Sequence, residues 1–237
     1  MANTIMPGQT FFVRYTNDFK KNEIAVFDYF GNDYSSPAEE FGKFNQHWEK
    51  RVFRIIAWSG DTLEIKNGDV FINRHRISPP DLALANYEIR SSVYIDDLAN
   101  IDQYGSAMQR SGDTFIYTVA LSLTEVRNYE LRKPAVISVR RISPEISLED
   151  TFFTRLSKKD KWSPDNYGPL VIPSPGETIQ IDSTNFKLFK NIPGVQPGNY
   201  TLKEKLYFML GDNRHRAEDS RYIGLIAHSK MYGIVKL

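Results

Sequence analysis

Residues 206 to 221, near the C-terminal end of the chain, read LYFMLGDNRHRAEDSR. The run Leu206–Leu210 is apolar and aromatic and predicts a buried strand that ends at a glycine. An isolated Gly-Asp-Asn turn is more often a solvated loop, but here six polar residues crowd into the ten positions from Asp212 to Arg221. Asp and Asn side chains bond locally in turns, and an Asp–Arg pair adds a charge-assisted bond, so we expect a rigid loop against a cleft. The supporting residues of this loop are Gly211, Asp212, Asn213, Arg214, Asp219, Ser220 and Arg221.

A second Gly-Asp turn lies between two predicted strands in the first third of the chain. Arg54–Trp58 and Thr62–Ile65 alternate in a strand-like way around Gly60-Asp61. The dipeptide Asn67-Gly68 follows, and it can supply the positive φ angles of a type I′ hairpin turn. We therefore expect a third strand at Val70–Asn73.

Short β-branched or aromatic runs, bounded by Gly, Asp, Asn or Pro, recur toward both ends of the chain and predict a mainly β fold. Further strands are expected at Thr10–Val13, Ile24–Phe27, Thr178–Ile181 and Met231–Val235.

The middle of the chain differs from both ends. From about residue 75 to residue 160 it has longer polar stretches with helical spacing, and Ser147–Leu156 has a serine N-cap and apolar residues on one face. Strands are also expected there, at Thr114–Tyr117 and Ala135–Val139. We predict an antiparallel β core at 1–73 and 162–237, interrupted by a smaller α+β lobe at 74–161.

Composition excludes several classes of protein. The 237 residues include 30 Lys+Arg and 29 Asp+Glu, which gives a formal net charge of +1. Such a near-neutral chain has no excess of positive charge to attract the phosphates of nucleic acid. There is no cysteine, hence no disulfide, thiolate nucleophile or Cys-bound metal. The four histidines are not spaced as zinc ligands, and we expect neither a metal nor a cofactor. The apolar runs are too short to cross a bilayer, and the N-terminal residues do not form a secretory signal.

The two Gly-Asp segments resemble conserved boxes of the bacterial type I signal peptidases, which are membrane-anchored serine proteases with a Ser/Lys dyad on a β fold. The family box G-D-N-R-x-x-S-x-D-S-R stands here as residues 211–221. The lysine box K-R-x-x-x-x-P-G-D-x-x-x-I stands as residues 53–65. Residues 165–173 are also similar to the stretch that returns from the inserted lobe in some members. The resemblance runs from one end of the chain to the other in family order.

Two positions depart from the lysine and C-terminal boxes. Phe53 stands where the family has its general-base lysine, and Ala217 stands where the family has the serine that bonds that lysine. A buried Phe gains about 1.5–3 kcal/mol from burial, and Ala leaves no hydroxyl unsatisfied, so the two changes are consistent as a pair. Lys50 is a rival base, but it lies three residues upstream and an odd shift would turn every side chain to the opposite face.

The nucleophile box, S-M-x-P-T-L-x-x-G-D in the family, allows two alignments. In one, its methionine is Met1, the substrate-binding stretch is Met1, Ala2, Asn3 and Thr4, and the serine position falls just before Met1. In the other, Thr4–Pro7 lies on S-M-x-P and Thr4 is the nucleophile, at the cost of a two-residue deletion before Gly8.

The resemblance implies a domain on the outer, periplasmic face of the bacterial cytoplasmic membrane, tethered by a helix upstream of this sequence. Its partners would be the signal peptides of exported proteins, with small side chains before the cleavage site. Such a peptide would lie extended along a core strand. The changes at Phe53 and Ala217 leave two functions open: a serine endopeptidase with an impaired dyad, and a non-catalytic homologue that binds exported polypeptides or assists surface assembly. A β domain that binds something unrelated through the middle lobe is a third possibility.

Overall fold

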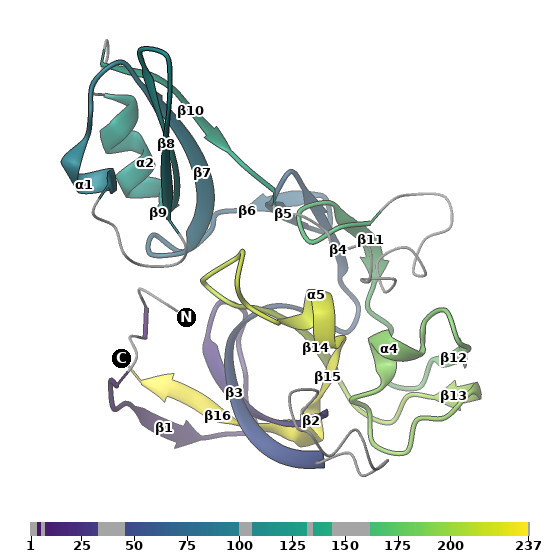
Figure 1. Cartoon of the computed structure of the whole chain (residues 1–237). Helices are drawn as coiled ribbons and strands as arrows, with labels where there is room; N and C mark the ends of the chain where they lie inside the picture. Colours follow the sequence, from purple (N-terminus) through teal and green to yellow (C-terminus); the bar gives the residue numbers. More distant parts are fainter. Residues whose placement is uncertain are drawn as a thin grey trace, which may run out of the picture.

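The computed structural model of the chain describes residues 4–5, 8–32, 46–99, 106–131, 135–143 and 162–236. It is mainly β, as predicted, and all the strand ladders within its sheets are antiparallel. Figure 1 shows the lobe sheet at one end, a smaller sheet in the middle and a curved sheet around the termini.

The largest sheet carries both candidate boxes. Its strands, in spatial order, are β1 (Phe12–Tyr15), β16 (Met231–Lys236), β2 (Ile24–Asn32), β3 (Gln46–Trp58), β14 (Leu206–Leu210) and β15 (Ile226–Ala227). The strand β2 pairs over its whole length with the longer β3, from Ile24 opposite Arg54 to Asn32 opposite Gln46. On the other side of β3, β14 pairs only with its last part, from Tyr207 opposite Trp58 to Leu210 opposite Arg54. Among the described residues, no strand covers that second edge of β3 from Gln46 to Phe53.

The middle sheet follows directly from the two hairpins. It contains β11 (Tyr167–Val171), β4 (Thr62–Lys66), β5 (Asp69–Ile72) and β6 (His75–Ile77). The predicted Asn67-Gly68 hairpin is present, with φ of 49° and 80°. A second hairpin has Asn73 and Arg74 at φ of 51° and 69°, and it adds β6, which the sequence did not predict. The chain therefore stays in this sheet to Ile77, beyond the predicted start of the lobe at residue 74.

The lobe has its own sheet and its own buried cluster. The sheet order is β10 (Val136–Arg141), β7 (Leu84–Ser91), β9 (Thr114–Ser122) and β8 (Ala107–Ser111), and two short helices accompany it, α1 (Asp96–Ala99) and α2 (Leu123–Glu130). Buried apolar residues between 85 and 136 pack with one another as a cluster of their own. The two strands expected in the lobe are present as β9 and β10, and β7 and β8 add two that were not predicted. The predicted helix Ser147–Leu156 lies outside the described residues. The lobe boundaries remain a prediction.

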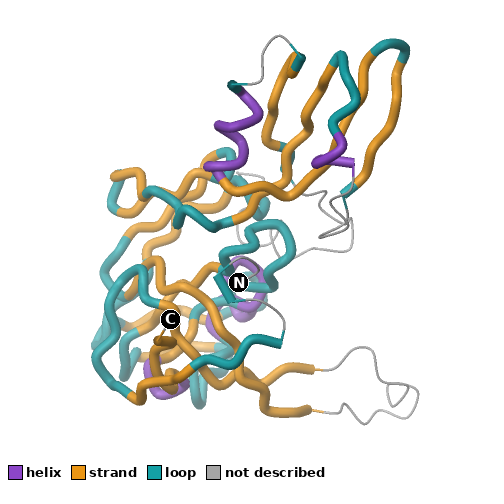
Figure 2. Tube along the Cα trace, turned by 90° about the vertical axis from the view of Figure 1, so that its left-hand side faces the viewer, coloured by secondary structure: helices purple, strands orange, loops and turns teal. Residues whose placement is uncertain are grey.

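The remaining elements complete the β core. They are β12 (Thr178–Ile181) paired with β13 (Gly198–Thr201), the short helices α4 (Phe186–Phe189) and α5 (Ser220–Ile223), and the 3₁₀ turn η2 (His228–Lys230). The predicted strands are all present in the described residues, although β1 begins two residues later than expected. Figure 2, turned by 90°, shows the lobe at one end and the largest sheet at the other, with the middle sheet between them.

Candidate functional site

Phe53 and Ala217 border the same point of the structure. Gly211 ends β14 next to β3, and a β-carbon placed on it would overlap Ala217 Cβ and lie 3.5 Å from both Cδ1 and Cε1 of Phe53. The two positions that depart from the family boxes are thus brought together from residues 164 apart in sequence. Only glycine leaves room for this close approach, because any side chain at position 211 would displace Ala217.

Phe53 extends one of the hydrophobic clusters of the core. It lies opposite Ala25 on β2 and packs against the cluster that contains Phe27, whose ring centroid is 5.8 Å from its own. Alternation along β3 explains its position, because Phe53 and Ile55 face the same side of the sheet. A side chain that neither accepts nor donates protons therefore occupies this end of the core.

Asp212, the residue after Gly211, is bonded to side chains from two other parts of the chain. Its carboxylate is fully buried and accepts a bidentate pair of bonds from Arg54, from Nε at 2.9 Å and from Nη2 at 2.7 Å. Thr4 Oγ1 donates to Asp212 Oδ2 at 2.5 Å. Burial by itself raises the pKa of Asp212, but the bonds from Arg54 and Thr4 outweigh it, and the pKa is lowered. A carboxylate with a lowered pKa is a weak proton acceptor.

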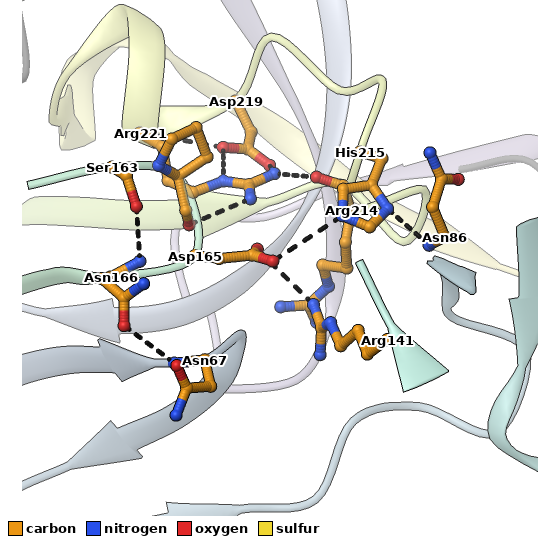
Figure 3. A network of polar contacts seen from close by, with 11 residues as sticks. Asn67, Asn86, Arg141, Ser163, Asp165, Asn166, Arg214, His215, Asp219 and Arg221 are labelled. Atoms are coloured by element: carbon orange, nitrogen blue, oxygen red, sulfur yellow. Dashed lines mark hydrogen bonds and ion pairs between the residues drawn. The ribbon is translucent and has the colours of Figure 1, made fainter. Parts of the chain in front are cut away.

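Asp219 and Arg221 form a buried brace below the loop (Figure 3). The Asp219 carboxylate accepts bonds from Arg221 Nε at 2.8 Å and Nη2 at 2.9 Å, and from the backbone N–H of Gly211 at 3.0 Å. Arg221 also donates to the carbonyls of Pro164 and Arg214. Asp219 in addition caps helix α5 by accepting from the Arg221 backbone N–H.

Ser220 and Asn213 hold the ends of the same loop. Ser220 Oγ accepts from the Met209 backbone N–H at 2.9 Å, inside the core. Asn213 forms a parallel bridge with Leu84 at the start of the lobe, flanked by the bonds Leu84 N–H to Asp212 C=O, 2.7 Å, and Arg214 N–H to Leu84 C=O, 2.9 Å. The loop that carries Ala217 is therefore attached both to β14 and to the lobe.

The two rival candidates lie in different places. Lys50 is half-exposed, pairs with Asp28 Oδ1 at 2.7 Å and lies over the ring of Tyr232. Its ammonium group therefore interacts with these residues and not with the site at Gly211. Thr4 lies at Asp212, where its hydroxyl donates to the carboxylate. The other three residues of the predicted substrate-binding stretch, Met1, Ala2 and Asn3, lie outside the described residues.

A further polar group was not predicted from the sequence. Asp165 is 1% exposed and lies between His215 Nε2, 3.7 Å from its Oδ2, and Arg141 Nη2, 3.6 Å from its Oδ1. His215 Nδ1 in turn accepts from the Asn86 backbone N–H (Figure 3). Burial raises the pKa of Asp165, but the neighbouring His215 and Arg141 outweigh burial and the pKa is lowered. The sequence showed Asp165 and His215 only as members of the family-like boxes, and Arg141 gave no signal.

The described residues contain no group of three or more His, Asp or Glu side chains arranged to hold a metal ion. They also contain no helix that is both long and apolar enough to span a membrane.

Comparison with known proteins relates the whole chain to one family. The family model for signal peptidases, peptidase S26, matches residues 1–237. Signal peptidase I of Bacillus amyloliquefaciens is 32% identical over 82 residues, which are 35% of this chain and 35% of the relative. The match thus spans about a third of that relative. On the strength of the family model, the chain belongs to the signal peptidase family, peptidase S26.

Proposed function

We propose that this chain is an extracytoplasmic signal-peptidase-like domain that binds exported polypeptides, such as signal peptides, and whose Ser/Lys dyad is impaired or absent. The observation that carries the proposal is the position of Phe53, which packs beside Gly211 and Ala217. In the alignment with the lysine box of the type I signal peptidases, Phe53 stands where those enzymes have the lysine. The periplasmic location, and a membrane tether outside this sequence, belong to the same proposal and rest on family membership alone.

Loss of the proton relay follows from the chemistry of the two side chains. In a Ser/Lys mechanism a neutral lysine takes the serine proton and later protonates the leaving amine. Phe53 cannot exchange a proton, and Ala217 cannot bond an amine. General-base catalysis typically contributes about 10²- to 10⁴-fold to rate, so a site with these two residues loses a factor of that order.

The peptide-binding half of the proposal rests on the edge of β3. Among the described residues, the side of β3 facing away from β2 has no strand partner from Gln46 to Phe53, and this edge ends beside Gly211 and Ala217. An extended peptide can add a strand to such an edge through backbone hydrogen bonds, with side-chain pockets supplying selection. Binding in this mode needs no catalytic residue.

A working endopeptidase with Thr4 as nucleophile is the second candidate, and one contact favours it. Thr4 Oγ1 is bonded to a carboxylate, Asp212, within the candidate site. The same carboxylate is bound by Arg54 and has a lowered pKa, so it is a poor base for activating the hydroxyl. The non-catalytic reading therefore remains the main proposal.

Peptide binding and peptide cleavage separate these functions. We expect the purified chain to bind an Ala-x-Ala signal peptide and to leave it uncut over many hours. The same peptide with alternate amides N-methylated is the matched control, since it keeps the side chains but cannot pair with the β3 edge. Cleavage above a boiled control would refute the impaired dyad, and equal binding of both peptides would refute strand addition.

Restoring the dyad tests the assignment of the site. A variant with a serine placed ahead of Met1, Phe53→Lys and Ala217→Ser should gain measurable cleavage of the unmethylated peptide. The matched control carries the serine and Ala217→Ser but keeps Phe53, and it should stay inactive. A folded triple variant that gains nothing would contradict the assignment of Phe53 to the lysine position.

A further inference from the structure

Arg214 is a buried cation for which the described residues provide no partner. It is 7% exposed, its Nε has no hydrogen-bond partner, and its guanidinium forms no ion pair. Only its backbone is bonded, to Leu84 and to Arg221. Burial lowers the pKa of Arg214 to about 10, which still leaves it charged at neutral pH. A buried charge without a partner is costly, and such groups in proteins are nearly always paired.

The guanidinium borders a cavity between the middle sheet and the start of the lobe. The cavity holds about 50 Å³ and is lined by both Arg214 and Arg141, by the apolar side chains of Val70 and Leu84, and by Tyr87. Exposed residues at its rim, Arg76 and Ile77 of β6, connect it to solvent. A volume of this size accommodates a few water-sized groups, comparable to the three heavy atoms of a carboxylate.

Charges around the cavity leave one positive charge uncompensated. Arg141 and Arg214 line the cavity, and Arg221 lies close enough to affect the charge of Arg214. These three arginines face two buried carboxylates, Asp165 and Asp219. Asp219 forms an ion pair with Arg221, and Asp165 Oδ1 lies 3.6 Å from Arg141 Nη2. This balance leaves Arg214 as the unmatched cation.

The neighbouring charged groups do not change this balance. The ring of His215 is held by the backbone, because its Nδ1 accepts the Asn86 N–H. Arg54 and Asp212 neutralise each other through their bidentate bonds. At the rim, Asp69 is paired with Arg76 at 2.9 Å.

We propose that this cavity binds one singly charged oxyanion, best matched by a carboxylate, between the guanidinium groups of Arg214 and Arg141. A planar carboxylate accepts two parallel N–H bonds from a guanidinium, and Arg141 Nε is a second buried donor without a bond. The site is distinct from the point where Phe53 and Ala217 meet, and the inference does not depend on the proposed function.

Thermal unfolding of the whole chain tests the site, with acetate or inorganic phosphate as the probe against chloride at equal ionic strength. Arg214→Met removes the charge and keeps most of the apolar bulk. Arg127→Met, on the exposed face of helix α2, is the matched control. The probes should raise the melting temperature of the wild type and of Arg127→Met. Calorimetry on Arg214→Met should show binding weakened by about 10-fold or more, as expected for lost charged hydrogen bonds.

Arg214→Met should fold, because replacing an unpaired buried charge by an apolar side chain relieves a desolvation cost. In the absence of anion its melting temperature should equal or exceed that of the wild type. Equal stabilisation of all three proteins by the probes, or of none, would overturn the proposal and leave water as the occupant of the cavity.

Two sources could supply the carboxylate, and a peptide pair distinguishes them. A short peptide with one glutamate and its glutamine counterpart, both amidated at the C-terminus, are titrated with and without acetate. Glutamate-specific binding that acetate competes away identifies an acidic side chain as the ligand. If free acetate or phosphate binds and neither peptide does, the site serves a free anion. If no anion of either kind binds, the proposal fails.

Discussion

Replacing Asp219 with asparagine removes the charge at the centre of the buried brace. The carboxylate is 0% exposed and accepts bonds from Gly211 N–H, from Arg221 Nε and Nη2, and from the Arg221 backbone N–H. The single side-chain oxygen of asparagine can accept only part of this set. The amide N–H₂ that replaces the second oxygen would face other N–H donors, with which it cannot form hydrogen bonds. Arg221, only 2% exposed, would then be a buried cation without a counter-charge.

Removing one partner of a buried ion pair typically costs about 3–5 kcal/mol. For a chain of this size each kcal/mol lowers the melting temperature by roughly 2–4 °C, so Asp219→Asn should unfold roughly 6–20 °C below the wild type. The matched control is Asp28→Asn, which removes a partly exposed pair with Lys50 at 2.7 Å and should cost less than about 1 kcal/mol. Melting followed by circular dichroism measures both. If Asp219→Asn melts together with Asp28→Asn, the loop after β14 is a solvated loop and not a brace.

Three further changes test other parts of the fold. Ser122→Ala removes the capping box that Ser122 and Glu125 form at α2 and should cost about 1 kcal/mol in urea unfolding, with Ser122→Asp restoring most of it. Leu63→Ala empties a fully buried position on β4 and should cost about 2–5 kcal/mol in the same assay; a smaller loss would mean that the middle sheet collapses around the cavity. Because the pKa of Asp212 is lowered in the folded state, its pairing with Arg54 stabilises the chain above the unfolded pKa near 4 and is lost as pH falls below it. Asp212→Asn should therefore be less stable at pH 7 and should show a shallower loss in acid, and parallel acid profiles would contradict this.

Local sequence signals predicted most of the strands of the largest sheet and the middle sheet. The hairpin at Asn67-Gly68 was predicted because asparagine and glycine tolerate positive φ. The next turn places Arg74 at φ 69°, which an arginine rarely adopts. The sequence therefore did not indicate this second turn, and β6 was not predicted. The lobe was predicted as α+β, and its two expected strands are present as β9 and β10. The strands β7 and β8 were not predicted; β8 is exposed along its whole length, so apolar alternation is weak there.

Pairings across long separations in the chain were outside the reach of sequence patterns. Arg54 and Asp212 are 158 positions apart, and only the pairing of β3 with β14 brings them together. The position of Asp165 against Arg141 depends on how the lobe sheet meets the middle sheet, which no local pattern encodes. The neighbouring positions of Phe53 and Ala217 were expected from the family boxes, and the structure places both at Gly211.

The bridge between Leu84 and Asn213 also has a consequence for how separable the lobe is. Its two backbone bonds give Asp212 C=O and Arg214 N–H their partners, and those partners belong to the first residue of the lobe sheet. An excised lobe would leave a strand end uncapped, and a core without the lobe would have to rebuild its C-terminal loop. For engineering, chimaeras that exchange the lobe between relatives should be joined after Leu84, so that this bridge travels with the core.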